Sequence, residues 1–398
     1  MRRVAAWAAG LLLASTAQAA TWKVDPAGRS GAWKSFAAID WPRIRPGDRI
    51  VIAGGQRYAG PLDVEASGAP GRPVTIETDG KGEVLIDGGM KLEFCVRLDG
   101  SDHVVVRGLT VRDCVDAGFR IRNATGVVAE RNTVHAPARA FHVWRTSDVT
   151  IADNRVTTPG FVDLQTDGIY SQENRDNRYL RNDIVISNGE PEGHDDGIQS
   201  YRDADLLIAG NYIEQRNAKD GNAQGIFITA ASGRMTVVDN TVYAPATRNG
   251  LVTLINLDGS KGALDAFHNT LVGGKWGVIH IEDAPGSRLR NNIIASEFAD
   301  AAGIAIAGPP PAAAEIDHNL YHLPRGAPGY AVDGATYAWP AWRARGFERH
   351  GVTGDPRFAD PAARRFTPSP GSPAIGAAAA ISGLGRATPG LDIGAAPR

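Results

Sequence analysis

The 398-residue sequence contains only two cysteines, Cys95 and Cys114, and three methionines. Two cysteines are too few for the disulfide framework of a small secreted scaffold, and their spacing is not that of a zinc site. A bridge across a corner of the fold and two buried free thiols remain open alternatives for this pair. A disulfide miniprotein is excluded.

The chain also lacks an excess of charge of either sign and a long apolar run. It has 42 basic and 44 acidic residues and a formal net charge of −2. A nucleic-acid-binding protein normally carries a basic field, so no nucleic-acid partner is expected. No segment is apolar over enough residues to cross a bilayer, so no membrane span is expected.

The N-terminus has the pattern of a cleaved signal peptide. Arg2 and Arg3 precede a short apolar run, which ends at the small-x-small sequence Ala17-Gln18-Ala19. We expect residues 1–19 to be removed by cleavage near Ala19/Ala20. The mature protein is then secreted or periplasmic.

Glycine is abundant, with 47 residues, and a repeat of roughly 22 residues follows the N-terminal region. Each repeat closes on Asn-x-apolar, at Asn132, Asn154, Asn182, Asn211, Asn240, Asn269 and Asn292. Each opens on a small residue and an alternating strand, at Gly118, Ala140, Gly168, Gly197, Gly225, Gly250 and Gly277. Short strands in a repeat of this length are typical of a β-solenoid, in which stacked Asn side chains can satisfy a bent corner.

After the expected signal peptide, the repeat divides the chain into three parts. Residues 20–90 are expected to form an N-terminal cap and the first rungs, 91–350 the parallel β-helix, and 351–398 a tail packed along it. Three short strands are expected in each rung. The longer repeats contain extra residues. We expect these to form loops along one edge of one face, at about 156–166, 186–195, 215–223 and 243–248.

Several segments outside the repeat resemble secreted proteins with a right-handed parallel β-helix. Residues 46–50, 58–62 and 71–76 resemble the N-terminal part of such proteins, and residues 354–376 resemble their common tail. The resemblance implies an all-β, right-handed parallel β-helix fold. Because lyases, hydrolases, epimerases and adhesins share this fold, it does not decide the chemistry.

Strand alternation places a set of polar and aromatic side chains on one outer face of the solenoid. Such side chains suit sugar rings, hydroxyls and carboxylates, and the arginines favour an acidic polysaccharide. A face buried by the C-terminal tail is the alternative. The predicted substrate-binding residues are Arg120, Arg122, His142, Trp144, Arg145, Tyr170, Gln172, Gln199, Tyr201 and Arg202.

Acidic residues stand at the edge of this face on two successive rungs. Aligning Gly168 with Gly197 stacks Asp196 on Asp167, about 4.8 Å apart, with Asp195 and His194 adjacent. Like charges at this distance raise the pKa of the group, which suits glycosidic cleavage by an acid and a carboxylate. A plain Asp-Gly turn is one alternative, and a Ca²⁺ site formed by the three aspartates is another.

The two segments also resemble polygalacturonase-type glycosidases, which have Asn-Thr-Asp-Gly on one rung and Asp-Asp on the next. The resemblance implies that Asp195 is the general acid and that Asp167 and Asp196 assist it. The sequence departs from that family at Gln165, where Asn is expected. It also has Ala223-Gln224-Gly225 in place of Gly-His-Gly, and it lacks Arg-x-Lys near residues 250–256.

The same rungs resemble alginate-type C5-epimerases and lyases, although the Asp-Pro-His triplet of that family is absent. A set for proton abstraction from a uronate can still be formed by Tyr170, His142 and Arg145 or Arg202. We therefore expect an enzyme that cleaves an acidic polysaccharide by hydrolysis at Asp167, Asp195, Asp196 and His194. The alternatives are a lyase or C5-epimerase and a non-catalytic glycan-binding protein. No cofactor is expected except in the Ca²⁺ alternative, and a monomer is expected.

Overall fold

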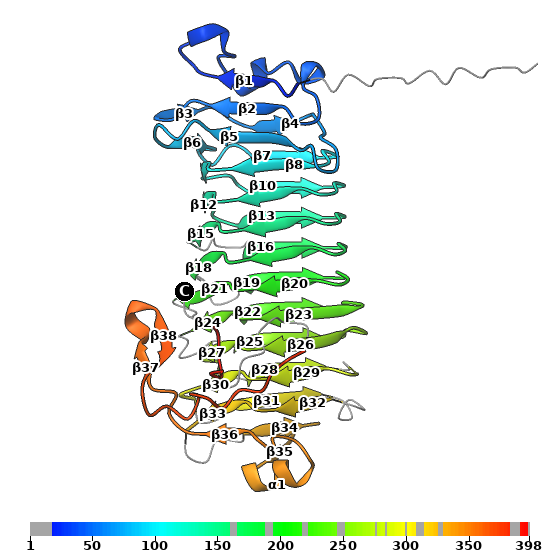
Figure 1. Cartoon of the computed structure of the whole chain (residues 1–398), viewed down its shortest axis with the longest axis vertical. Coiled ribbons are helices and arrows are strands. Elements are labelled where there is room, and N and C mark those ends of the chain that lie inside the picture. Colours follow the sequence, from blue (N-terminus) through cyan, green and yellow to red (C-terminus); the bar gives the residue numbers. More distant parts are fainter. Residues whose placement is uncertain are drawn as a thin grey trace, which may run out of the picture.

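The computed structural model describes residues 18–159, 165–187, 194–216, 222–244, 251–274, 277–282, 285–298, 301–307, 314–324, 329–382 and 391–396. Nearly all of the expected signal peptide and the central parts of the four expected loops lie outside these residues. Within them, three sheets of 12 strands each run the length of the molecule (Figure 1). Their strands pair in parallel, except that Ala335–Tyr337 is antiparallel to its neighbour.

The chain passes from sheet A to sheet B to sheet C in every rung. Sheet A contains β1 (Thr21–Val24), β2 (Arg49–Ile52), β5 (Val74–Thr78), β8 (Val104–Arg107), β11 (Val128–Glu130), β14 (Thr150–Ala152), β17 (Arg178–Leu180), β20 (Leu207–Ala209), β23 (Arg234–Val238), β26 (Ala263–Phe267), β29 (Arg288–Arg290) and β32 (Glu315–Asp317). Sheet B contains β3 (Gln56–Tyr58), β6 (Val84–Asp87), β9 (Thr110–Arg112), β12 (Thr133–His135), β15 (Arg155–Thr158), β18 (Asp183–Ser187), β21 (Tyr212–Arg216), β24 (Thr241–Tyr243), β27 (Thr270–Val272), β30 (Ile293–Ala295), β33 (Leu320–His322) and β36 (Val352–Thr353). Sheet C contains β4 (Leu62–Val64), β7 (Phe94–Asp99), β10 (Ala117–Arg122), β13 (Arg139–Trp144), β16 (Thr166–Gln172), β19 (His194–Tyr201), β22 (Asn222–Thr229), β25 (Leu251–Asp258), β28 (Gly277–Glu282), β31 (Ala302–Ala307), β34 (Tyr330–Val332) and β35 (Ala335–Tyr337).

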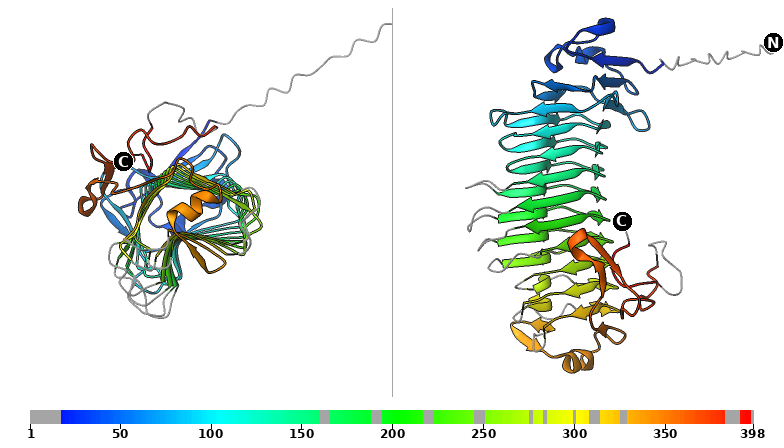
Figure 2. Two further views of the ribbon diagram at one scale, coloured as in Figure 1. Left: turned by 90° about the horizontal axis from the view of Figure 1, so that it is seen from below. Right: turned by 90° about the vertical axis from the view of Figure 1, so that its left-hand side faces the viewer.

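The strands stack as successive rungs, so the molecule is a parallel β-helix, as the sequence predicts (Figure 2). Inward side chains are apolar and buried, and stacked rings such as Phe119 and Phe141, 5.0 Å apart, fill the interior. A single core of buried Ile, Leu, Val and aromatic side chains runs from the first rung to the last. The alternation of buried and outward residues in each strand fixes which side chains reach the outer face.

The corner between sheets A and B is bent through a residue with left-handed backbone, followed by a buried Asn. In the rung of Asn182, the preceding residue Arg181 has a φ of 52°. The side-chain oxygen of Asn211 accepts hydrogen bonds from the backbone N–H of Asn182 (2.9 Å) and from its side-chain amide (3.0 Å). The same pattern links every predicted Asn from Asn132 onward. The predicted ladder is therefore confirmed.

The ladder continues two steps beyond the predicted residues. Asn292 bonds to Asn319, and Asn319 donates to both oxygens of Glu348, a buried residue after the last full rung. Tyr321 donates a further hydrogen bond of 2.6 Å to Glu348. Burial raises the pKa of Glu348 to about 7, against these hydrogen bonds. A carboxyl group thus ends the column of amides.

Both ends of the solenoid are covered by non-repeating segments. At the N-terminal end these are the short 3-10 helices η1 (Arg29–Gly31), η2 (Phe36–Ala38) and η3 (Trp41–Arg43), and at the C-terminal end helix α1 (Trp339–Ala344) (Figure 1). Trp342 of α1 is fully buried and stacks on Tyr330 at 4.2 Å. No helix in the described part of the chain is long and apolar enough to cross a membrane.

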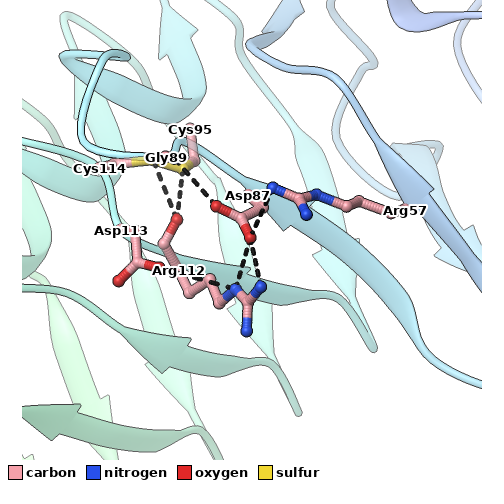
Figure 3. Close-up of a disulfide and its surroundings, with 7 residues drawn as sticks. All are labelled: Arg57, Asp87, Gly89, Cys95, Arg112, Asp113 and Cys114. Carbon is pink, nitrogen blue, oxygen red and sulfur yellow. Dashed lines mark hydrogen bonds and ion pairs between the residues drawn. A yellow bond between two sulfur atoms is a disulfide. The ribbon is translucent and has the colours of Figure 1, made fainter.

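Cys95 of β7 and Cys114, just after β9, form a disulfide (Figure 3). This decides between the two alternatives that the sequence left open. Beside it, Asp87 of β6 lies between two arginines of neighbouring strands, 3.0 Å from Arg57 and 2.6 Å from Arg112 (Figure 3). The bridge and this ion-pair column join the first rungs to one another.

The strands of the C-terminal tail lie beside β24 and β27 of sheet B (Figure 1). They are β37 (Phe358–Asp360) and β38 (Arg365–Pro368), with η4 (Pro361–Ala363) between them. Arg364 donates a hydrogen bond of 2.6 Å to Glu214, and the ring of Phe366 meets that of Tyr243 edge-on at 5.0 Å. Further along the tail, Ile381 packs on Val238 and Phe267 of sheet A. The contacts of the described tail residues thus fall on sheets A and B and not on the predicted substrate-binding face of sheet C.

The ladder predicts a strong effect of a single central Asn. Replacement Asn211→Ala leaves the buried N–H and amide groups of Asn182 without acceptors, at about 1–3 kcal/mol for each unsatisfied group. We expect the free energy of unfolding to fall by about 2–4 kcal/mol, as measured by urea denaturation. The control is Thr133→Ala, which removes an exposed side chain from β12. A loss no larger than that of the control would contradict the structural role of the ladder.

Candidate functional site

The predicted substrate-binding residues lie together on the outer face of sheet C. The strand register stacks Arg120, His142, Tyr170, Gln199 and Phe227 in one column, which we call the outer column. A second column beside it contains Arg122, Trp144, Gln172, Tyr201 and Thr229. All of these side chains are partly exposed except Gln199, which is 9% exposed.

The predicted acid pair is stacked as expected, because Asp167 is the register partner of Asp196. Both side chains are 0% exposed. Oδ1 of Asp167 accepts a hydrogen bond from the backbone N–H of Asp196 (3.3 Å), and Oδ1 of Asp196 accepts one from the N–H of Gln224 (2.9 Å). One oxygen of each carboxyl group is thus bound to the backbone of the next rung.

Glycine is required near the start of β16 and β19, directly after the stacked aspartates. A Cβ on Gly168 would lie 2.5 Å from Cγ2 of the core residue Ile184, and one on Gly197 would lie 2.3 Å from Cγ2 of Ile213. The glycines therefore face the core, as do the isoleucines that follow them. Two consecutive inward positions interrupt the alternation, and this turns the preceding aspartates to the outer side.

The other oxygen of each carboxyl group faces a cation. Oδ2 of Asp167 lies 3.7 Å from Nε of Arg139, and Oδ2 of Asp196 lies 3.2 Å from Nδ1 of His194. Arg139, Asp167, Asp196 and His194 therefore form a charge stack, with the cations at its two ends. Arg139 was not predicted. Aligning Ala140 with Gly168 would have found it, because this alignment places Arg139 beside Asp167.

Burial dominates the electrostatics of this charge stack. Burial and the repulsion of Asp196 raise the pKa of Asp167 well above its ordinary value, and burial raises the pKa of Asp196 although His194 opposes it. For His194, burial disfavours the charged ring, but the contact with Asp196 outweighs it and raises the pKa to about 9. At neutral pH the stack therefore holds a charged imidazole beside two carboxyl groups whose pKa values are raised by burial.

Asp195, the predicted general acid, is 2% exposed. Its Oδ1 accepts a hydrogen bond of 3.1 Å from the backbone N–H of Thr166. Burial raises the pKa of Asp195 to about 6. A carboxyl group with this pKa is protonated in part near neutral pH, but among the described residues it is bound to a neighbouring rung and covered.

Above the charge stack, His142 and Tyr170 are adjacent in the outer column, with ring centres 5.3 Å apart and edge-on. Nδ1 of His142 lies 3.6 Å from Oδ2 of Asp116, a residue that the sequence analysis missed. Arg139 donates a hydrogen bond of 2.5 Å to Oδ1 of Asp116, and its guanidinium lies 4.9 Å from the centre of the Tyr170 ring. Burial raises the pKa of Tyr170. Asp116 thus lies within ion-pair distance of the imidazole, and Tyr170 stays protonated.

The predicted arginines differ in what they contact. Arg122 pairs with Asp99, and Arg145 pairs with Glu173 at 2.8 Å. Arg145 and Arg202 are exposed residues just after their strands and lie over aromatic rings. Arg120 lies over the ring of Phe94 at 4.6 Å, and within the described part of the chain it has no carboxylate in ion-pair distance. Arg120 is therefore the cation of the outer column that is available to an anionic ligand.

The arrangement of the three aspartates does not fit a Ca²⁺ ion. Calcium takes six to eight oxygen ligands. Here Asp167 and Asp196 each use one oxygen for a backbone N–H, and the other faces a cation. A divalent cation at this place would be repelled by Arg139 and by protonated His194.

Comparisons with known proteins identify the fold. Residues 94–254 match the profile of the family described as "Right handed beta helix region". The chain is a right-handed parallel β-helix protein. The solved structure of the pectate lyase Pel9A is similar over 96% of this chain and 97% of that one, with 13% identity and a TM-score of 0.62.

Two further structures are similar at lower scores. The alginate lyase from Paenibacillus sp. str. FPU-7 aligns over 80% of this β-helix protein and 99% of that chain, with 14% identity and a TM-score of 0.48. PfbA, a surface adhesin of Streptococcus pneumoniae, aligns over 72% and 84%, with 10% identity and a TM-score of 0.47. A comparison with curated proteins finds no match. At these identities the similarity establishes the fold of the β-helix protein and leaves its chemistry to the site.

The raised pKa of His194 predicts a specific pH dependence of stability. The pKa of a histidine is near 6.5 in an unfolded chain and about 9 for His194 here. Between these values the folded state binds more protons, so the free energy of unfolding falls as pH rises from about 6.5 to 9. Between pH 7 and pH 9.5, we expect the free energy of unfolding to fall by about 1–2 kcal/mol less in His194→Gln than in the wild type, as measured by denaturation at both pH values. If it falls as much in His194→Gln as in a His135→Gln control, the charge stack is contradicted.

Proposed function

We propose that the protein is a secreted or periplasmic enzyme that cleaves a uronate-containing polysaccharide by β-elimination. One observation carries the proposal: His142, backed by Asp116, lies between the unpaired cation Arg120 and the protonated Tyr170 in a single column on the outer face. The right-handed β-helix fold shared with Pel9A supports it by providing a long sheet face, and the described tail residues pack on the other sheets. Acid–base groups and a cation for the carboxylate are what this reaction needs.

In the proposed reaction, Arg120 binds the carboxylate of the uronate and makes its C5 proton more acidic. Nε2 of His142 takes that proton, while Asp116 at Nδ1 stabilises the imidazolium that forms. The electron pair of the C5–H bond forms the C4–C5 double bond as the C4–O4 bond breaks. Tyr170 donates its proton to the leaving oxygen. The products are a new chain end and an unsaturated uronate, so atoms and charges balance.

Hydrolysis by the aspartates is the second candidate. It is favoured by the raised pKa values of Asp195 and Asp167, since a general acid must keep its proton near neutral pH. Hydrolysis requires the side chains of Asp195 and Asp167 to contact the sugar. Their exposed fractions are 2% and 0%, whereas 17% of the His142 side chain is exposed. For this reason we place elimination before hydrolysis.

The experiment is an assay on a panel of acidic polysaccharides that records reducing ends and unsaturated-uronate absorbance together. We expect both signals to rise. Because general base catalysis contributes about 10²–10⁴-fold, His142→Gln should lower kcat at least about 100-fold. His135→Gln, which changes an exposed histidine on sheet B, should leave kcat unchanged.

Three other outcomes would overturn the proposal. Reducing ends without absorbance, lost in Asp195→Asn, would establish hydrolysis. A change of uronate configuration without new chain ends would establish epimerisation at the same residues. Glycan retention without any reaction, weakened by Trp144→Ala, would establish a binding protein.

A further inference from the structure

A cluster of two histidines and one aspartate lies at the C-terminal end of the solenoid, away from the outer column. Asp317 ends β32, His318 follows it in the corner before β33, and His350 precedes β36. One ligand atom of each residue lies within 4.8 Å of the other two. Oδ2 of Asp317 is 2.8 Å from Nδ1 of His350 and 3.4 Å from Nδ1 of His318.

The carboxylate of Asp317 is held in place by the backbone. Its Oδ1 accepts hydrogen bonds from the N–H of His318 (2.9 Å) and from the N–H of His350 (2.8 Å). The two imidazole rings stack at 4.6 Å, with 21° between their planes. As a result, Oδ2 of Asp317 lies close to both Nδ1 atoms, and the stacked rings need to turn before both nitrogen lone pairs point at one ion.

We propose that Asp317, His318 and His350 bind one divalent transition-metal ion of the zinc class. Two imidazole nitrogens and one carboxylate oxygen favour Zn²⁺, Co²⁺ or Ni²⁺ over Ca²⁺ and Mg²⁺, which prefer oxygen ligands. Ligands at about 2.0–2.2 Å from a tetrahedral ion are about 3.2–3.6 Å apart, so the 2.8 Å contact needs to open and the two stacked rings need to turn. Water completes the coordination.

Arg290 limits the affinity of this site. Its Nη2 lies 3.4 Å from Nδ1 of His318, while its Nη1 pairs with Glu315 at 2.8 Å. The nearby positive charge opposes a cation, and the Glu315 carboxylate offsets part of that repulsion. With three protein ligands and this neighbour, we expect a dissociation constant in the micromolar range.

The bound ion would connect two parts of the chain. Asp317 and His318 belong to the last rung, and His350 belongs to the segment that follows the capping helix α1. An ion held by both resists separation of this cap from the rung. The proposed role is therefore a clamp that closes the open end of the solenoid.

The test uses the full mature chain without a histidine tag. Calorimetric titration with Zn²⁺ should give one site, and Co²⁺ should give the visible spectrum of a tetrahedral nitrogen- and oxygen-ligated ion. Zn²⁺ at about 100 times the dissociation constant should raise Tm by about 3 °C. His350→Ala, which changes an exposed side chain, should abolish the cobalt spectrum and the Tm shift while leaving the metal-free Tm nearly unchanged.

His135→Ala is the matched control, because it removes an exposed histidine on sheet B whose ring bonds Thr157. This variant should bind the metal as the wild type does. Equal binding by wild type and His350→Ala would overturn the assignment. Absence of binding below millimolar Zn²⁺ would show that Asp317 and His350 form a structural hydrogen bond only.

Discussion

The fold depends on how each rung turns from sheet A to sheet B. The chain bends there through a left-handed residue such as Arg181, and in that bend the backbone N–H of the next residue lies inside the molecule without a strand partner. The side-chain amide of the Asn one rung further on accepts that N–H and donates to a carbonyl of the preceding rung. Since each Asn completes the corner of its neighbour, no corner from Asn132 to Asn319 is satisfied alone, and these rungs are held in one register.

A fixed register places outward residues of successive strands in straight columns, and this explains how much could be predicted from the sequence. The spacing of the asparagines and glycines was sufficient to predict the rungs, the stacked pair Asp167 and Asp196, and the composition of the outer column. The rungs follow from the repeat spacing, the outer column follows from strand alternation, and the stacked pair follows from aligning the two glycines.

The features that could not be predicted depend on how deeply side chains are buried and what they contact, and not on strand register. Alignment shows that two carboxylates are stacked, but it does not show that both are fully buried or that Arg139 and His194 face them. Asp116 lies outside the repeat pattern, so alternation gave no reason to place it behind His142. Likewise Glu348, which ends the Asn ladder, is a carboxylate where the pattern would lead to another amide.

The buried and exposed layers of sheet C are coupled through Arg139. Asp167 holds one side of this guanidinium from below, while its outer side binds Asp116 and lies over the ring of Tyr170. Asp116 in turn lies 3.6 Å from Nδ1 of His142. A buried pair of like charges is costly on its own, and the flanking cations lower that cost. In the proposed mechanism, Asp167 therefore acts from beneath the reacting residues: its charge attracts Arg139, which binds Asp116 beside the base and lies over the ring of the acid.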